Sequence, residues 1–330
     1  MGKKYKHLIE RIASIENLRD AYEKTARGKR LSYGFLEFKE YAPANLTLIR
    51  EAILDGGWSQ GPYREFTVHE PKARLISALD FKDRLAQHAL CNVIGPIFDR
   101  ALLPQTFACR DGRGTHAGVR FIQSRLRSTG AKYYLKTDFS RFFHSIDRAI
   151  LHDMIERKIG CRPTLRLIRS MVPNTGHGLP IGSLTSQLFA NVYGNAIDRL
   201  IHFDLGHRSW ARYMDDIVIL GFDLDHLKRS FGVIENYARN ELKLTISKWN
   251  ACAVTRGINF LGYRIWPTHK LLRKASVVRA KRKIKGFIHR NDNIGLNKFI
   301  ASWAGHARWA DTHNLATHLE NHHGIPIRHQ

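Results

Sequence analysis

The sequence predicts an α+β fold in which an antiparallel sheet and helices are mixed along the chain. Short apolar runs predict strands, and apolar residues three and four apart predict the helices between them. The order of these elements, β, α, α, β, β, α, β, lacks the regular alternation of a doubly wound parallel sheet. The predicted strands are 132–136, 210–213, 217–221 and 243–247, and the helices begin at 148 and span 184–200 and 225–241.

The part before this sheet predicts helices and one hairpin. Gly56 and Gly57 follow the second helix, where a glycine commonly ends a helix. The predicted elements are helices at 8–26, 46–53 and 80–98 and a hairpin at 63–79 with its turn near 70–72. The chain accordingly divides into a helical N-terminal extension (1–55), a central α+β region (56–265) and a basic helical region (266–330).

The charge indicates a polyanionic partner. The chain has 53 Lys and Arg against 29 Asp and Glu, a formal net charge of +24, and 43% hydrophobic residues give it a sizeable core. Nucleic acid is the first candidate for such an excess and an anionic membrane surface the second. No apolar run approaches the roughly 20 residues needed to span a bilayer. We expect a cytoplasmic protein without a membrane anchor, and its four widely spaced cysteines to be free thiols.

Two adjacent acids, Asp215 and Asp216, carry the clearest chemical pattern. Apolar strands precede and follow them, which predicts a tight turn between two buried strands. Two neighbouring carboxylates repel each other, and burial raises that cost unless a cation is bound. Asp138 ends another apolar strand and could meet the pair at one sheet edge. Three carboxylates suit hard divalent ions such as Mg²⁺, whereas a bare Asp-Asp pair alone would more often be a solvated hairpin.

Tyr213-Met214-Asp215-Asp216 resembles the YxDD motif of reverse transcriptases, and Asp138 resembles the first palm aspartate of that family. The resemblance implies a right-hand polymerase fold with fingers, palm and a short helical thumb. It also implies an RNA-directed DNA polymerase that uses template RNA, a cDNA primer duplex and dNTPs. Two Mg²⁺ ions, for which Mn²⁺ could substitute, would be held by Asp138, Phe139, Asp215 and Asp216. Lys248 takes the approximate place of the general acid that protonates pyrophosphate.

Further segments resemble this family in the correct order. The nucleotide-binding residues implied by the resemblance are Lys72, Arg74, Arg110, Phe143, Ile181, Gly182 and Gln187. Phe143 takes the place of the gate that rejects a 2′-hydroxyl, although the adjacent Phe142 leaves the register open by one residue. Ala108 and Cys109, before Arg110, depart from the usual Gly-Phe. The implied primer grip is Phe260, Leu261, Gly262 and Tyr263.

The segment from 271 to 290 predicts a basic amphipathic helix. It carries eight basic residues and no acid, so we expect it to contact duplex phosphates in a salt-dependent, sequence-independent manner. The expected nucleic-acid-binding residues are Arg273, Lys274, Arg279, Lys281, Arg282, Lys283 and Lys285. His318 and His322 lie four residues apart on a further predicted helix, where surface histidines are a better interpretation than a metal site.

Two departures within the family indicate a subgroup. Ile181 replaces the usual glutamine, and Ser183 to Gln187 replaces the usual S-P-x-S-P pattern. Both match the reverse transcriptases of diversity-generating retroelements. That resemblance implies copying of a template-repeat RNA with misincorporation opposite adenine, and an accessory variability protein that forms a pentameric barrel. A retron or group II intron-like reverse transcriptase, or a non-catalytic RNA-binding scaffold derived from a polymerase, remains an alternative.

Overall fold

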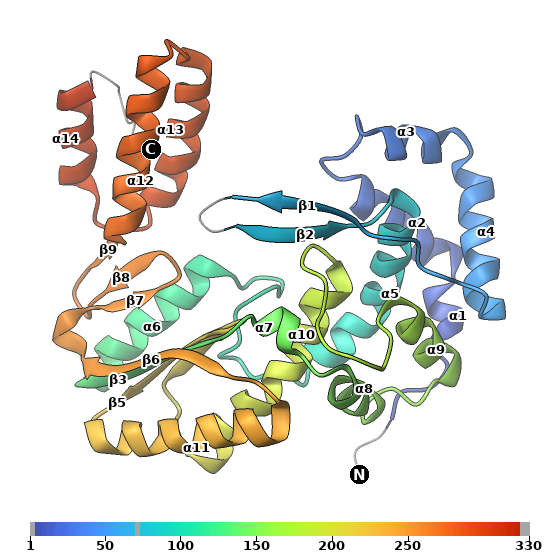
Figure 1. The fold of residues 1–330 in the computed structure, drawn as a ribbon, viewed down its shortest axis with the longest axis horizontal. Helices are drawn as coiled ribbons and strands as arrows, with labels where there is room; N and C mark the ends of the chain where they lie inside the picture. Colours follow the sequence, from blue (N-terminus) through green and yellow to red (C-terminus); the bar gives the residue numbers. More distant parts are fainter. Residues whose placement is uncertain (1–3, 70–72, 324–330) are drawn as a thin grey trace.

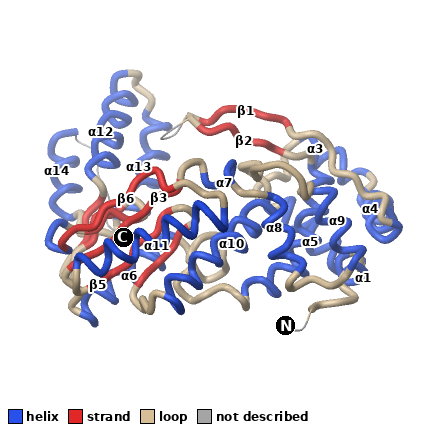
Figure 2. Tube along the Cα trace, turned by 60° about the horizontal axis from the view of Figure 1, so that its bottom comes forward, coloured by secondary structure: helices blue, strands red, loops and turns tan. Residues whose placement is uncertain are grey.

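The computed structural model describes residues 4–69 and 73–323 and places a four-stranded sheet between two helical parts (Figure 1). The sheet is antiparallel, with the strand order β4-β5-β3-β6. Figure 2 shows its strands gathered in one half of the molecule and surrounded by helices. The strands are β3 (Tyr133–Phe139), β4 (Trp210–Tyr213), β5 (Asp216–Gly221) and β6 (Ile246–Ala253).

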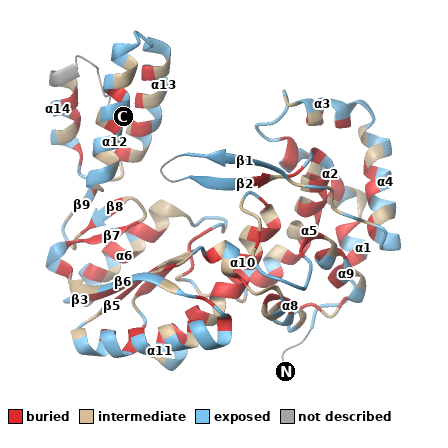
Figure 3. Ribbon diagram, in the orientation of Figure 1, coloured by how far each residue is buried: buried red, intermediate tan, exposed pale blue. Residues whose placement is uncertain are grey.

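The two faces of this sheet bury different cores, as the alternation of side chains requires. Leu135 and Ile219 point into one core, which includes helices α10 (Leu184–Arg199) and α11 (Leu224–Leu242). Tyr134 and Val218 point into a second core, which includes helix α6 (Thr115–Thr129) and the C-terminal elements. The four-stranded sheet therefore separates two hydrophobic cores; β3, β4 and β5 are mostly buried, whereas β6 is largely exposed (Figure 3).

The N-terminal helices pack on the first core. The single helix predicted over 8–26 is in fact two helices, because Ser14 accepts a hydrogen bond from the backbone N–H of Asn17 and caps a new helix there. The elements are α1 (Ile9–Ile12), α2 (Ile15–Ala26), α3 (Tyr33–Glu40), α4 (Ala42–Asp55) and α5 (Phe81–Asp99). Helix α4 ends at Gly56, whose φ is 81°, as the glycine pair predicts.

The predicted hairpin is confirmed as β1 (Arg64–Val68) paired with β2 (Arg74–Ala78). It extends from the N-terminal helices toward the gap below the C-terminal helices, and every residue of β1 is exposed (Figure 3). The strand predicted at 243–247 begins later, at Ile246, because Lys243 adopts a left-handed conformation (φ 53°) at the end of α11. The shorter helices are α7 (Phe142–Ser145), α8 (Arg148–Glu156) and α9 (Arg162–Met171).

The C-terminal part consists of a small sheet and three helices on the second core. The order of this antiparallel sheet is β7-β8-β9. Its strands are β7 (Ile258–Phe260), β8 (Tyr263–Ile265) and β9 (Lys270–Leu272), and the helices are α12 (Lys274–His289), α13 (Asn293–Ala307) and α14 (His313–His323). None of the helices in the described ranges is long and apolar enough to cross a membrane.

Candidate active site

The acidic pair lies at a two-residue turn between β4 and β5, with Asp215 in the turn and Asp216 at the start of β5. Tyr213 is paired with Asp216, so Met214 and Asp215 form the turn. Met214 is buried and has a φ of 54°, a conformation that is uncommon for a residue other than glycine and that often marks a functional site. Asp138 is the direct cross-strand partner of Asp216. Because directly opposed residues share a face, both carboxylates lie on the face that carries the second core.

A buried ion pair holds this turn, and the sequence analysis missed it. Arg212 donates from Nε and Nη2 to the two carboxylate oxygens of Asp198 on α10, both at 2.7 Å. Its Nη1 donates to the carbonyl of Met214 at 3.1 Å, and Thr106 Oγ1 donates to Asp198 at 2.7 Å. Arg212 is packed so tightly that a Cβ at Gly194 would lie 2.6 Å from its guanidinium. The turn is thus braced from inside the protein.

Burial and mutual repulsion raise the pKa of both acids in the turn. The pKa of Asp215 is raised to about 6, mainly by desolvation and also by the nearby charges of Asp138 and Asp216, while a backbone hydrogen bond and the charge of Arg74 oppose the rise. Desolvation also raises the pKa of Asp216, which Lys136 opposes. Lys136, two residues before Asp138 on β3, places Nζ 2.9 Å from both Asp216 oxygens. A cation near the turn therefore lowers the free-energy cost of keeping two neighbouring carboxylates ionised in a buried site.

The donor set fits a divalent cation in its chemistry. Asp138 and Asp216, on two adjacent strands, are direct cross-strand partners, and the buried Asp216 Oδ1 lies 2.9 Å from the ammonium of Lys136. Within the described residues no group of three His, Cys, Asp or Glu side chains is arranged closely enough to hold a metal. The Asp216 carboxylate is paired with Lys136 in this arrangement. The Phe139 side chain is buried and apolar, so only its backbone carbonyl could serve as a ligand.

A comparison with known protein families identifies the family to which a chain with this acidic site belongs. The family described as "Reverse transcriptase (RNA-dependent DNA polymerase)" matches residues 68–265, more than half of the chain. The chain belongs to the reverse transcriptase family. Reverse transcriptases act on a template RNA and a nucleic-acid primer with dNTPs and use divalent metal ions. The mixed helices and antiparallel sheets described above are accordingly the right-hand fold of this family.

The individual relatives are distant. Protein YkfC of Escherichia coli (strain K12) is 23% identical over 285 residues, which cover 70% of this chain and 72% of YkfC. The group II intron-encoded protein LtrA of Lactococcus lactis is 22% identical over 174 residues, 49% of this chain and 29% of LtrA. Nuclear intron maturase 2 of Arabidopsis thaliana is 25% identical over 142 residues, 38% of this chain and 19% of that protein. Telomerase from Candida albicans superposes with a TM-score of 0.49 and 12% identity, covering 66% of this chain and 46% of telomerase.

The predicted nucleotide-binding residues Ile181 and Gly182 lie where β2 approaches the loop before α10. The backbone N–H of Ser77 donates to the carbonyl of Ile181 at 2.8 Å. A Cβ at Gly182 would lie 3.0 Å from Ser77 O and from Ile76 Cγ2, so this close approach requires glycine, whose φ is 112°. Ile181 is half-buried and belongs to neither core. Its side chain is therefore not explained by core packing.

The structure separates the two phenylalanines proposed as the gate. Phe142 is buried in the first core, whereas Phe143 is only partly buried. The Phe143 carbonyl accepts a hydrogen bond from the N–H of Leu179 at 2.7 Å, which ties Phe143 to the loop that carries Ile181. Phe143 is thus the better placed of the two. Gln187 is half-buried in the first turn of α10, and Lys72 lies outside the described residues.

The hydrogen bonds of Arg110 do not support its predicted role in nucleotide binding. Its Nε donates to Asp99 at 2.5 Å, and Nη1 donates to the carbonyls of Leu103 and Thr106 at 2.8 and 3.0 Å. The side chain is only 8% exposed. The guanidinium is thus used to hold the loop after α5, a distant pairing that the local motif could not indicate.

The predicted primer grip is a tight turn whose flanking aromatic side chains face inward. Phe260 and Tyr263 are fully buried, so their side chains face the protein interior, and the assignment of this segment as the primer grip stays a prediction. The Tyr263 hydroxyl is 2.9 Å from His306 Nδ1 and joins the turn to α13. Leu261 and Gly262, with φ values of 49° and 91°, form the turn that remains accessible.

The basic residues of α12 start beside the acidic turn. The positive charge of Arg273, just before α12, lowers the pKa of Asp216 against the effect of burial, and its N–H donates to the Gly262 carbonyl at 3.0 Å. Ala280 and Ile284 bury the other side of the helix. Arg273 and Lys281 are partly exposed, and the fully exposed members of the predicted set are Lys274, Arg279, Arg282, Lys283 and Lys285. Lys248, the cross-strand partner of Asp138, is also exposed.

Proposed function

We propose that this reverse transcriptase copies a template-repeat RNA into cDNA with misincorporation opposite adenine, so that the cDNA diversifies a target gene. The observation that carries the proposal is Ile181. Its backbone is anchored on β2, the strand that begins at Arg74, while its partly exposed apolar side chain offers no hydrogen bond. A glutamine there could bond near the incoming sugar. Losing one such bond is worth roughly 0.5 to 1.5 kcal/mol, up to about tenfold in discrimination.

Nucleotide addition would use the acidic turn together with the residues around it. Asp138, Asp215, Asp216 and the Phe139 carbonyl would hold two Mg²⁺ ions, or Mn²⁺ in their place. When bound, these ions activate the primer 3′-hydroxyl and neutralise the triphosphate. Arg74 would hold phosphate oxygens through its planar guanidinium, and Phe143 would exclude a 2′-hydroxyl. Lys248 would donate a proton to the leaving pyrophosphate from beside Asp138.

The proposed division of labour follows the chain. Residues 56–265 would form fingers and palm, residues 266–330 the thumb, and residues 1–55 an N-terminal extension. The thumb residues Arg273, Lys274 and Lys285 would follow the backbone of the template–primer duplex. A small accessory variability protein, assembled as a pentameric barrel, would join the enzyme and its RNA in a bacterial cytoplasm.

The test is the error spectrum of Ile181→Gln and Ile181→Asn in primer extension on an RNA template that contains all four bases. We expect misincorporation opposite adenine to fall by up to about tenfold, with other positions little changed. Ile150→Gln, at a half-buried isoleucine of α8, is the matched control and should leave the spectrum unaltered. An error spectrum that is the same in wild type and both Ile181 variants contradicts the proposal.

A group II intron-like reverse transcriptase is the second candidate, because LtrA and an intron maturase are among the relatives. The two candidates differ in what activates them. Efficient copying that needs the accessory protein and a cognate repeat RNA supports the retroelement function. Accurate copying of unrelated templates by the protein alone supports the intron-like function.

A further inference from the structure

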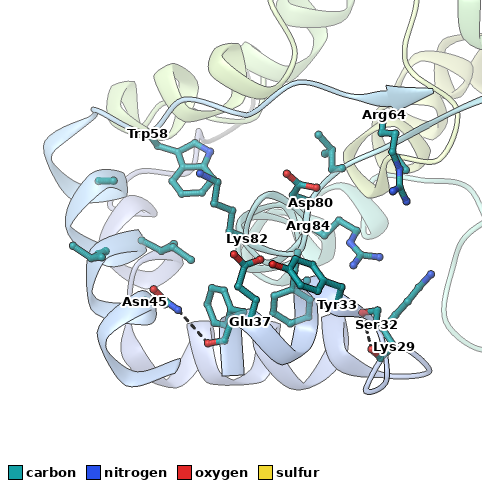
Figure 4. A pocket seen from close by; sticks show the side chains of 18 of the residues that line it. Lys29, Ser32, Tyr33, Glu37, Asn45, Trp58, Arg64, Asp80, Lys82 and Arg84 are labelled. Carbon is teal, nitrogen blue, oxygen red and sulfur yellow. Dashed lines mark hydrogen bonds between the residues drawn. The ribbon is translucent and has the colours of Figure 1, made fainter. Parts of the chain in front are cut away.

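A buried polar network joins helix α5 to the loop that carries Ile181. In the first turn of α5, Lys82 and Arg84 line an open cavity (Figure 4). Asp83 and Gln87, four residues apart on one face of the same helix, are instead only 1% exposed. Buried polar groups lower stability unless their hydrogen bonds are made, so the partners of these two side chains indicate what this face of the helix does.

Gln87 makes hydrogen bonds at both ends of its amide. Oε1 accepts from the Ser183 hydroxyl at 2.9 Å and from the N–H of Leu184 at 3.1 Å. Nε2 donates to Gln60 Oε1 at 2.8 Å, and Gln60 Nε2 donates to the Tyr63 hydroxyl at 2.9 Å. Because the backbone N–H of Leu184 can only donate, the oxygen of Gln87 must face it, which fixes the orientation of both glutamine amides.

The same network reaches the segment before β1 at two further points. Burial raises the pKa of Tyr63, and hydrogen bonding to Gln60 and Ser183 opposes the rise, so the Tyr63 hydroxyl interacts with Ser183 as well. Asp83 Oδ1 accepts from the N–H of Gly61 at 3.1 Å. Helix α5 thus holds the segment before β1 and the start of α10 together.

Strand β2 holds the other end of the same loop. The N–H of Ser77 donates to the Ile181 carbonyl at 2.8 Å, and a Cβ at Gly182 would lie 3.0 Å from Ser77 O. Gln87 binds the loop again at Leu184, where α10 begins. The segment 181–184 is therefore fixed from the hairpin on one side and from α5 on the other, and the position of the Ile181 side chain depends on both contacts.

We propose that Gln87 is a positioning residue that sets the affinity of this reverse transcriptase for the incoming dNTP by holding the loop of Ile181. The inference rests on the proposed binding of the nucleotide at this loop, and not on mutagenic copying. Since Gln87 is buried, it acts through Ser183 and Leu184. Arg212 braces the acidic turn independently, so loss of the Gln87 hydrogen bonds affects nucleotide binding more than the chemical step.

The experiment is steady-state primer extension by the full chain on poly(rA)/oligo(dT) with Mg²⁺ and varied dTTP. Gln87→Met keeps an unbranched side chain but loses the amide, and it should raise KM for dTTP about three- to tenfold while kcat stays within about twofold. Gln87→Glu keeps an acceptor oxygen for Leu184 and should return KM to within about twofold of wild type. Partial unfolding would instead lower the amount of active enzyme, and with it kcat, without changing KM.

Gln123→Met is the matched control on α6. Gln123 is 6% exposed, its Nε2 donates to the Trp266 carbonyl at 3.3 Å, and its Oε1 accepts from Lys270 at 3.3 Å. This variant also loses a buried amide, but KM for dTTP should stay within about twofold of wild type. If Gln87→Met does not fold, Ser183→Ala removes one donor to Gln87 and should raise KM about threefold.

An unchanged KM in folded Gln87→Met, or in Ser183→Ala where it replaces that variant, overturns the proposal, and so does an equal rise in Gln123→Met. The proposed function fails in a different way. A raised KM in Gln87→Met, beside an error spectrum that Ile181→Gln leaves unaltered, would argue against mutagenic copying and support the positioning role. An unchanged KM in Gln87→Met, beside an altered spectrum in Ile181→Gln, would overturn the positioning role alone.

Discussion

Replacing Arg212 by methionine tests how the acidic turn is held. The substitution keeps an unbranched apolar stem and removes the guanidinium that bridges Asp198 to the Met214 carbonyl. The two charged side chains are only 1% and 0% exposed, so water cannot replace the lost donors. The buried Asp198 carboxylate would keep only the hydroxyl of Thr106 at 2.7 Å.

The expected loss of stability is large because one partner of a buried pair is left alone. Breaking such a pair typically costs about 3 to 5 kcal/mol. Since Thr106 still donates to Asp198, we expect a value near the lower end, about 3 kcal/mol. The rate of primer extension should also fall, because the carbonyl of Met214 loses the donor that fixes the turn.

Urea unfolding measures the effect, with Arg239→Met as the control. Arg239 forms an exposed pair with Glu235 at 3.5 Å, and its loss should change the free energy of unfolding by less than about 0.5 kcal/mol. The double variant Arg212→Met/Asp198→Leu removes both charges and should recover part of the stability lost in the single variant. A loss below about 1 kcal/mol in Arg212→Met, or a double variant no more stable than the single one, would refute the reasoning.

The remaining predictions concern the cation near the turn. Lys136→Met should lower the free energy of unfolding by about 1.5 to 3 kcal/mol in EDTA. In excess Mg²⁺ the loss should be smaller, because a bound cation replaces the ammonium at Asp216. Equal losses of stability in EDTA and in Mg²⁺ would contradict this prediction. Asp215 has a raised pKa of about 6, so its contribution to stability is present below its unfolded pKa near 4 and lost as pH rises through about 6. Without metal, Asp215→Asn should therefore be more stable than wild type above pH 6 and similar to it near pH 4, which urea titrations at several pH values would show. For wild type, the Mg²⁺ concentration that gives half-maximal extension should rise about tenfold per pH unit below about 6, and a pH-independent requirement would argue against a role for Asp215 in holding the metal.

Local patterns in the sequence predicted most of the fold, since strands and helices depend on spacing along the chain. The β1–β2 hairpin, β3, the β4–β5 turn and α10 follow the predicted ranges closely. Helix α6 and helix α9 were not predicted, although their apolar residues do fall at helical spacing. The N-terminal helices share one core with the four-stranded sheet, and this core brings together residues from distant segments, such as Leu18 of α2 and Leu90 of α5.

Only those parts of the candidate site that are marked by short sequence motifs could be predicted from the sequence. Asp138 and Asp216 are direct cross-strand partners, and Asp215 precedes Asp216 in the turn, because β3 and β5 are neighbours in the sheet; the role of the three acids as metal ligands stays a prediction. Arg212 could not be found, because its partner Asp198 lies on another element and neither residue stands out as a motif. The pairing of Arg110 with Asp99 could not be predicted for the same reason, because Asp99 lies on another element and outside the local motif.

Primer extension on poly(rA)/oligo(dT) with Mg²⁺ tests the central claim, that the acidic turn is the centre of an RNA-directed DNA polymerase. The comparison is wild type against Asp215→Asn, with Asp225→Asn as a control at an exposed acid of α11. We expect wild type and the control to extend the primer and Asp215→Asn to lose extension. A cooperative urea unfolding transition in Asp215→Asn should show that this variant is still folded. Equal extension by wild type and Asp215→Asn, or a wild type that fails even with a cognate RNA and accessory protein, would contradict the claim.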